Sequence, residues 1–500
     1  MLAERRAGDA EAGSAARHAG VALVGNVLNQ VCFLVATVVI ARGLGPTQYA
    51  VYASAMALSI ILSTLAAGGL DVILVREAVR TREQAATYLG TAIALKLALT
   101  LVVLLGLALY DGAIGVAPMA RRALWVAMLA NLVRIHERTW VAAFRALGRM
   151  ALEGVVLGIQ GGLFVLLVVG LGARITDARG ALEALLGSYL VSLTVGMALI
   201  VRQGLRPRFG GGLPVARFMA REALPVGVAA VLAYLYERLP ILALGLLSAP
   251  GDVALFSSAF SIVRNLGVVP LVVAGAALPV LSRLAVGPGE HLQRAYGSVW
   301  RLLFALGVPL AVGCWFLAEP LMAVVFGPEY AGGYRVLRVL ATSVVFSFLA
   351  YLAKAGLEAT SAQARWTVVL AVGVVLGAGL QMALIPRLGH VGAGVALVVA
   401  DVVVLGLATR GLGRHIARPL AGLGRFVACC LLGGGAMVAL LVALQTVALL
   451  PRVLLGAALY LGALVALRAW DADEIAPLIA ALRRPGGREG LGHEAQKEVV

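Results

Sequence analysis

Hydrophobic residues come in blocks of about 20 along the chain, separated by short stretches that are rich in arginine, glycine and proline. A helix that rises 1.5 Å per residue needs about 20 residues to cross a hydrocarbon layer of about 30 Å. Each block therefore predicts one membrane-spanning helix, and the pattern predicts an all-α polytopic membrane protein of about 14 spans. The expected spans are 20–41, 49–70, 89–110, 122–145, 151–173, 181–202, 222–247, 253–282, 298–319, 335–357, 366–385, 391–410, 425–446 and 449–469.

The two ends of the chain are polar. Residues 1–19 carry basic residues before a hydrophobic block, as a signal peptide does, but the block is long and lacks a convincing cleavage site. We therefore expect an uncleaved first span behind a cytoplasmic N-terminal segment. Residues 470–500 begin with acidic residues and continue with basic ones, which predicts a short interfacial helix followed by a disordered tail. The stretches between the spans are too short for an extramembrane catalytic domain.

The composition indicates a membrane protein and excludes an ordinary soluble one. Hydrophobic residues make up 61% of the 500 residues and charged residues 13%, whereas soluble domains have roughly 45–50% and about 25%. The four cysteines, Cys32, Cys314, Cys429 and Cys430, all lie in hydrophobic blocks without the spacing of metal ligands. We interpret them as packing residues, and we expect no metal and no cofactor.

The net charge of +16 would suggest a nucleic-acid partner in a soluble protein. Basic residues are, however, concentrated in alternate connecting stretches: with the N-terminus in the cytoplasm, roughly 25 face the cytoplasm and roughly 8 face outward. This asymmetry predicts that both termini are cytoplasmic. Contacts between these arginines and anionic headgroups explain most of the net charge, so we expect membrane lipids and no nucleic acid as partners.

A tight turn recurs in the two halves of the sequence. ARGLGPTQYAVYASAMALSII, at 41–61, ends one span and opens the next, and LGLLSAPGDVALFSSAFSI repeats the device when Pro46 is placed on Pro250. In both copies a Pro turn precedes small residues and an aromatic residue, Tyr52 or Phe256, that we expect to anchor the span near the interface. A second similarity links 146–165 with 361–380. The alternative is that any two hairpins rich in leucine, valine and alanine align loosely.

An internal repeat of this kind predicts two pseudo-symmetric six-helix lobes of the same orientation, because an even number of spans separates the copies. Secondary transporters commonly bind substrate between such lobes near mid-membrane, which makes transport the leading hypothesis. The expected domains are an N-terminal lobe at 20–203, a cytoplasmic linker at 204–221, a C-terminal lobe at 222–410 and two extra spans at 425–469.

Four stretches resemble landmarks of a known family. ARGLGPTQYAVYASAMALSIILSTLAAGGLDVILVREAVR resembles the first-hairpin signature of bacterial polysaccharide-exporting flippases. ALGRMALEG, LPVGVAAVLAYLYERLPILALGLL and FGPEYAGGYRVLRVLA resemble their later landmarks. These flippases belong to the multidrug/oligosaccharidyl-lipid/polysaccharide exporter superfamily, and the similarity covers most of residues 20–410.

This resemblance implies a non-enzymatic function. It implies a flippase that moves an undecaprenyl-diphosphate-linked oligosaccharide across the bacterial inner membrane by alternating access, for cell-surface polysaccharide biosynthesis. The implied partners are this lipid-linked oligosaccharide and glycan polymerase or assembly proteins, and we expect a monomer. One departure concerns ion coupling: relatives often have an acidic residue after the arginine of the seventh span, where this chain reads Arg238, Leu239, Pro240.

The fourth predicted span holds the densest set of charges. A charge at the centre of a span costs about 2.5–3.5 kcal/mol on insertion scales, so such residues normally face protein or water. Asn131, Arg134, Arg138 and Arg145 lie within about 60° on a helical wheel, with Glu137 beside them. We expect Arg134 and Arg138 to line the cavity and to bind diphosphate. The alternative is that Glu137 pairs with one of them structurally while Arg145 reaches the cytoplasmic surface.

Other polar residues within spans complete the set of candidates. Further candidates for substrate binding are Asn26, Asn29, Gln30, Lys96, Tyr234, Arg238 and Arg264. Candidates for proton or ion coupling are Glu137, Glu237 and Asp401. Each has a structural alternative as an interhelical hydrogen bond, a cap or an ion pair. We expect mainly structural roles for five other charged residues. Asp71, Arg76 and Glu77 should form salt bridges in a cytoplasmic loop, and Lys354 should form an i,i+4 pair with Glu358.

Several other functions compete with the flippase hypothesis. A multidrug exporter of the same superfamily would favour an acidic cavity, whereas the predicted stripe is basic. A peptidoglycan-precursor flippase would need the same diphosphate chemistry. A membrane-embedded polysaccharide polymerase or ligase would need catalytic groups at a membrane face, commonly with help from a large extramembrane loop, and this chain has only short ones. No Walker loop, HExxH motif or nucleophile elbow occurs in the sequence, which argues against an ATP-driven pump.

Overall fold

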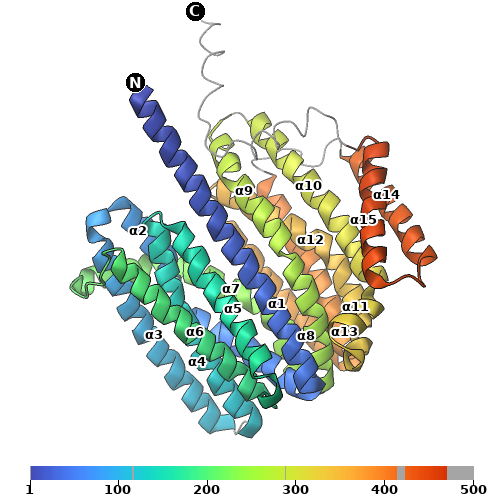
Figure 1. Ribbon diagram of the computed structural model, residues 1–500, viewed down its shortest axis with the longest axis horizontal. Helices are drawn as coiled ribbons and strands as arrows, with labels where there is room; N and C mark the ends of the chain where they lie inside the picture. Colours follow the sequence, from blue (N-terminus) through green and yellow to red (C-terminus); the bar gives the residue numbers. More distant parts are fainter. Residues whose placement is uncertain (1, 115–117, 288, 414–422, 470–500) are drawn as a thin grey trace, which may run out of the picture.

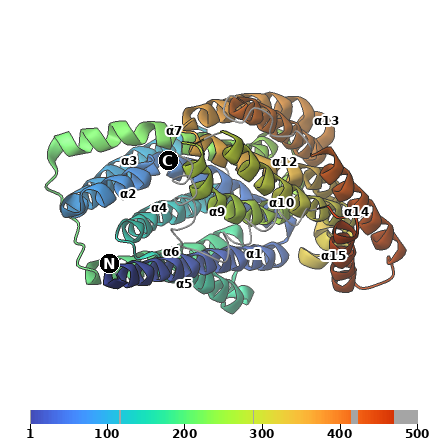
Figure 2. The same ribbon diagram turned by 90° about the horizontal axis from the view of Figure 1, so that it is seen from above.

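The computed structural model describes residues 2–114, 118–287, 289–413 and 423–469, and the regular elements of these residues are all helices (Figures 1 and 2). The predicted interfacial helix and tail at 470–500 lie outside the described residues. Eleven helical segments of the described chain are long and apolar enough to cross a membrane. The chain is therefore an all-α multi-pass membrane protein, and the count of about 14 spans stays a prediction.

The first helices of the chain pack mainly against one another, at the left of Figure 1. This N-terminal group contains α1 (Leu2–Ala67), α2 (Leu70–Arg80), η1 (Arg82–Gln84), α3 (Ala85–Ile114), α4 (Pro118–Ala146), α5 (Met150–Gly170), η2 (Gly172–Arg174) and α6 (Ala178–Arg202). α4 is not among the eleven apolar segments because charged residues interrupt it. Its interior side chains therefore need protein or water partners, which the other helices of the bundle supply.

The later helices form a second group. It contains α7 (Gly212–Leu247), α8 (Pro250–Leu266), α9 (Val268–Leu284), α10 (Gly289–Phe316), α11 (Ala318–Val325), η3 (Pro328–Gly333), α12 (Tyr334–Ala359) and α13 (Gln363–Leu412). Two further helices, α14 (Gly424–Ala443) and α15 (Leu449–Ala466), pack against each other and against α10, at the right edge of Figure 1. The predicted division into two pseudo-symmetric lobes and two extra spans stays a prediction.

Two very long helical runs are each broken by one glycine. Gly45 in α1 has φ 70°, and Gly389 in α13 has φ 55°. These positive φ values favour glycine because it lacks a Cβ atom. Helical runs of 66 and 50 residues are much longer than the about 20 residues that one crossing needs. The breaks lie where hydropathy predicts the turns between the first two spans and between the eleventh and twelfth.

Several helices extend beyond the predicted span limits at their polar ends, and two of these differences bear on the contacts between the helix groups. α7 begins at Gly212, inside the stretch predicted as linker, and its start lies against α2 and α3 (Figure 2). The preceding loop is held there because Arg208 N donates to Ala86 O at 2.9 Å. Asp71, Arg76 and Glu77 lie in helix α2 rather than in a loop. Hydropathy ends a span at the first charges, whereas a helix continues as long as its backbone bonds and one apolar face persist.

Candidate functional site

A cavity of about 220 Å³ lies between the two helix groups, lined by side chains from α1 and from α4 to α8. Because four arginines line it, we call it the arginine cavity. The structure brings most of the predicted binding residues together here. The predicted residues that line it are Asn29, Gln30, Asn131, Arg134, Arg138, Tyr234, Arg238 and Arg264.

Helix α4 supplies two of the arginines. Asn131 is fully buried, and its Nδ2 donates to Ser59 Oγ at 2.9 Å and to Ala127 O at 3.0 Å. Its Oδ1 accepts from Arg134 Nε at 3.1 Å, so Asn131 fixes the orientation of that guanidinium. Arg138, one turn further, makes no hydrogen bond and no ion pair with a described residue. Its donors are therefore available to an anion in the cavity.

Helices α7 and α8 supply the other two arginines, which share one carboxylate. Glu237 Oε1 lies 3.5 Å from Arg238 Nη2 and 3.3 Å from Arg264 Nη1. Arg238 Nε is buried without a partner among the described residues. The proposed ion-coupling residue Glu237 is thus the counter-ion of two cavity arginines.

The charge of the arginine cavity is strongly positive. Four guanidinium groups line it, and among the described residues only the carboxylate of Glu237 lies within ion-pair distance of any of them, so positive charge is in excess. Charges interact several times more strongly in a protein interior than in water. Arginine binds phosphate oxygens with two parallel N–H donors. Amides, hydroxyls and phenols make up much of the remaining lining and can bind sugar hydroxyls as donors or acceptors.

Several further polar residues that were not predicted from the sequence line the arginine cavity. The additional polar lining residues are Thr37, Tyr49, Tyr52, Gln160, Tyr189, Ser257, Ser261 and Asn265. Helical spacing could have found three of them, because Ser257, Ser261 and Asn265 follow at four-residue intervals on the face that carries Arg264. No local signal marks the tyrosines: Tyr52 is only 7% exposed and stacks on Tyr49. The expectation that Tyr52 anchors the span at the interface is wrong, because the ring packs inside the bundle.

Two predicted binding residues do not line the cavity. Lys96 is fully buried, and its Nζ lies 2.6 Å from Asp71 Oδ1, 2.8 Å from Thr139 Oγ1 and 2.9 Å from Ile135 O. All three ammonium donors are used within the N-terminal group. Asn26 Nδ2 donates to Ala22 O at 2.9 Å and contacts Glu153 Oε1 at 3.4 Å. Both side chains lie in separate polar clusters of the N-terminal group.

The remaining acidic candidates also lie away from the cavity lining. Glu137 is fully buried, and its Oε1 accepts from Ser192 Oγ of α6 at 3.1 Å. No described residue forms an ion pair with it, so the alternative in which Glu137 pairs with Arg134 or Arg138 does not hold among the described residues. Asp401 Oδ1 accepts from Tyr236 Oη at 2.6 Å within the second helix group.

Arg145 and Lys354 form ion pairs outside the lining of the arginine cavity. Arg145 forms a two-pronged ion pair with Glu153 of α5, with Nε 2.8 Å from Oε2. The Arg145 side chain is therefore held by Glu153, although it is 48% exposed. Lys354 and Glu358 form the expected i,i+4 pair at 3.5 Å, which confirms that interpretation.

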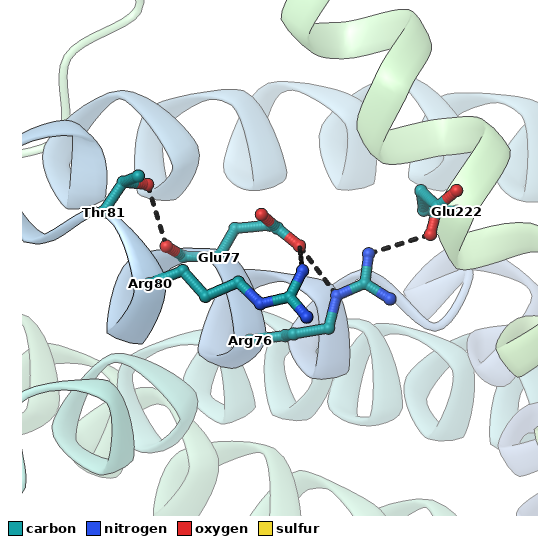
Figure 3. Close-up of polar contacts among 5 residues, drawn as sticks. All are labelled: Arg76, Glu77, Arg80, Thr81 and Glu222. Atoms are coloured by element: carbon teal, nitrogen blue, oxygen red, sulfur yellow. Dashed lines mark hydrogen bonds and ion pairs between the residues drawn. The ribbon is translucent and has the colours of Figure 1, made fainter. Parts of the chain in front are cut away.

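At one end of the bundle, α2 is joined to α7 of the other group (Figure 3). Arg76 Nη2 lies 2.8 Å from Glu222 Oε2, and Arg76 Nε lies 2.7 Å from Glu77 Oε1. The backbones also touch, since a Cβ atom on Gly69 would lie 2.6 Å from Gly227 N. This end is the one that the charge pattern predicts to face the cytoplasm.

At the opposite end, the turn of α1 contacts α11 and η3. Arg42 donates from Nε to Val325 O at 2.8 Å and from Nη2 to Val324 O. Tyr330 Oη donates to Ala41 O at 2.8 Å, and its ring meets that of Tyr49 edge-on. Arg42 thus caps the carbonyl end of α11. The two helix groups are connected on both sides of the arginine cavity.

Comparisons with solved structures identify the fold. The lipid II flippase MurJ in its inward closed conformation has a TM-score of 0.68 at 12% identity, covering 92% of this chain and 99% of that chain. An inward-facing multidrug resistance MATE family transporter of the MOP superfamily has a TM-score of 0.64 at 18% identity, covering 80% and 98%. A MOP superfamily transporter from Pyrococcus furiosus has a TM-score of 0.60 at 18% identity, covering 82% and 96%. At these identities the likeness establishes an all-α membrane transporter fold.

The family comparison adds to this. A search of curated proteins finds no significant match. The profile of the family described as "Polysaccharide biosynthesis protein" matches residues 15–285, more than half of the chain. This match and the transporter fold confirm the resemblance to the polysaccharide transporters of the exporter superfamily. The chain therefore belongs to the polysaccharide biosynthesis protein family.

Proposed function

We propose that this protein is a flippase that moves an undecaprenyl-diphosphate-linked oligosaccharide across the bacterial inner membrane by alternating access. The family match and the transporter fold support a flippase or exporter that serves polysaccharide synthesis. The observation that carries the finer proposal is the convergence of Arg134, Arg138, Arg238 and Arg264, two from each helix group, on one cavity.

The chemistry of the cavity suits a diphosphate. A group with two or more negative charges can contact both pairs of arginines and thereby link the two helix groups. Before it binds, Glu237 partly neutralises Arg238 and Arg264, so substrate and carboxylate compete for the same donors. This competition makes binding reversible, which transport requires because the substrate must also leave.

The size of the cavity implies movement. Its volume of about 220 Å³ lies below the roughly 300–1,000 Å³ of typical ligand pockets. An oligosaccharide can enter only if the helix groups separate at one end. The contacts to be broken are those of Arg76 with Glu222 at one end, or those of Arg42 and Tyr330 at the other.

Other functions fit the cavity less well. The excess of arginines over ion-paired carboxylates repels the cationic substrates that an exporter of positively charged drugs would carry. A peptidoglycan-precursor flippase remains the second candidate, because its substrate carries the same diphosphate and the fold resembles that of the lipid II flippase MurJ. The monomeric state, the partnership with glycan polymerase or assembly proteins, and the cytoplasmic position of both termini stay predictions.

The test is leaflet exchange in proteoliposomes. A fluorescent oligosaccharide on undecaprenyl diphosphate is placed in both leaflets, and a membrane-impermeant reagent that destroys the exposed label reports how fast the inner pool becomes accessible. We expect exchange with the parent protein and loss of most exchange with Arg134→Gln/Arg138→Gln. The matched control is Arg202→Gln, because Arg202 is an exposed arginine outside the cavity. Lipid II, offered in parallel, separates the two candidate substrates.

Two results would overturn the proposal. One is full exchange by the double variant at normal protein level and thermal stability. The other is equal exchange of a neutral glycolipid by the parent protein, because the arginines would then contribute nothing to recognition. Formation of new glycosidic bonds in the same vesicles would instead indicate a polymerase.

A further inference from the structure

A second basic site lies outside the arginine cavity, in a groove between the first turns of α4 and α6, which pack side by side (Figure 1). The groove has a volume of about 440 Å³. We call it the α4–α6 groove; its lining residues are Pro118, Arg121, Arg122, Trp125, Val126 and Arg179. None of these residues lines the arginine cavity, so a ligand here would be additional to the proposed substrate.

A buried carboxylate holds part of the groove in place. Asp111 of α3 is only 8% exposed. Its Oδ2 lies 2.7 Å from Arg121 Nε and accepts from Trp125 Nε1 at 3.1 Å. Because one carboxylate oxygen binds both side chains, the guanidinium and the indole are fixed relative to each other, and the outer nitrogens of Arg121 are free to face the groove.

The other two arginines are less constrained. Arg179 Nε lies 2.7 Å from Glu183 Oε1, one turn along α6. Arg122 is exposed and makes no hydrogen bond and no ion pair with a described residue. Three guanidinium groups and two carboxylates give the groove a net charge of +1.

Below the arginines, both helices present apolar residues along the same faces. On α4, Val126 and Leu129 follow Arg122 at helical spacing, and Leu129 is 50% exposed. On α6, Leu190 lies on the stripe that begins at Arg179 and is 44% exposed. The groove is therefore cationic at the helix ends and apolar toward the middle of the bundle, with Trp125 at the boundary, as tryptophan is in membrane interfaces.

We propose that the α4–α6 groove binds the headgroup of an anionic phospholipid that carries one phosphodiester charge. The arginines contact the phosphate, and the acyl chains lie along Leu129 and Leu190. The net charge of +1 matches one phosphodiester, whereas a diphosphate would leave negative charge unbalanced. The groove adjoins the turn of α1, because Gln48 contacts Met119 Sδ at 3.2 Å and accepts from Ala178 N at 3.2 Å. A lipid here would brace α4 and α6 beside that turn.

Trp125 provides the assay. The full-length protein is reconstituted in phosphatidylcholine vesicles, and phosphatidylglycerol with brominated acyl chains, a fluorescence quencher, is titrated in. Brominated phosphatidylcholine is the comparison lipid. The signal of Trp125 is the difference between the parent protein and Trp125→Phe. We expect brominated phosphatidylglycerol to quench this signal at a lower mole fraction than brominated phosphatidylcholine.

Variants test the contacts. Arg122→Gln and Arg179→Gln should each weaken the preference for phosphatidylglycerol about fivefold, and together about 25-fold, if each arginine contributes as basic residues do near anionic lipid surfaces. Arg202→Gln, at the opposite end of α6, should leave the preference unchanged. Native mass spectrometry of the same variants counts bound phosphatidylglycerol independently of fluorescence.

Four outcomes would overturn the proposal. Equal quenching by the two brominated lipids would show no headgroup selectivity, and an unchanged preference in the double variant would place the lipid elsewhere. Reversal of quenching by inorganic phosphate would indicate a site for free phosphate. Displacement of phosphatidylglycerol by equimolar farnesyl diphosphate would indicate a diphosphate site. If the leaflet-exchange experiment showed no transport of the proposed substrate, these lipid-binding measurements would still stand, because they measure binding without transport.

Discussion

The ion pair between Arg76 and Glu222 offers a direct test of how the two helix groups are held together. The pair joins α2 to α7 with an N–O distance of 2.8 Å. Glu222→Gln removes the charge and keeps the shape of the side chain. Arg76 keeps its contact with Glu77 at 2.7 Å, so the substitution removes only the bond between the groups (Figure 3).

The expected size of the effect follows from exposure. The side chains of Arg76 and Glu222 are 38% and 41% exposed, and ion pairs with this exposure contribute about 0.2–1 kcal/mol. Glu222→Gln should therefore favour separation of the groups by a factor of about 1.4 to 5. Glu222→Arg adds a repulsion of similar size against Arg76, so we expect a factor of about 2 to 30 in total.

The assay measures access to the arginine cavity. Ser261 lines this cavity, so Ser261→Cys in a background without the four native cysteines places one thiol there. The rate at which a membrane-impermeant thiol reagent labels it, from each side in turn, reports opening at each end. Labelling from the end that carries Arg76 should rise by these factors. A matched control is Glu183→Arg, which replaces the attraction within a somewhat more exposed pair, Arg179 and Glu183 of α6, by a repulsion.

A double-mutant cycle decides whether the pair itself is responsible. If Arg76 and Glu222 hold the groups through their mutual bond, Arg76→Gln/Glu222→Gln should change labelling no more than either single substitution. Strictly additive effects, or unchanged labelling in Glu222→Arg, would refute the idea that this pair closes the cavity. An increase equal to that of Glu183→Arg would show only a general effect of surface charge.

Three further predictions concern buried groups. Lys96→Met leaves the partly exposed Asp71 without its ammonium partner and should lower the free energy of unfolding by about 1–3 kcal/mol, measured by a thermal melt in detergent. Lys96→Met/Asp71→Asn should recover part of this loss. A melt unchanged by Lys96→Met would contradict the prediction. Asp401→Asn keeps the hydrogen bond from Tyr236 but cannot carry a proton, so substrate exchange should lose any stimulation by a pH gradient. Stimulation at the parental level would exclude Asp401 as the proton-coupling residue. Gly227→Leu should prevent the close approach of α2 and α7, because even a Cβ atom at this position would lie 2.9 Å from Gly68 C. Labelling of the Ser261→Cys reporter should therefore increase. Unchanged labelling would mean that the backbone contact is not needed to close the cavity.

Local sequence patterns were enough to predict where the chain is helical and apolar, and which polar residues share a helix face. Hydrophobic length is a local property, so the blocks predicted the membrane helices and the breaks at Gly45 and Gly389. Helical periodicity is local as well, and it placed Asn131, Arg134 and Arg138 on one stripe, all of which line the cavity. Local patterns failed at polar helix ends such as the start of α7, because the loss of hydrophobicity there does not end the helix.

The partner of each charged side chain could not be predicted in this way, because it depends on how distant helices pack. Lys96 appeared isolated in its span because Asp71 reaches it from another helix, and Glu237 proved to be the counter-ion of Arg264 on α8. The meeting of arginines from α4, α7 and α8 in one cavity likewise depends on how the helix groups pack. Periodicity fixes the direction of a side chain around its own helix axis, but the relative positions of distant helices come from packing over the whole bundle.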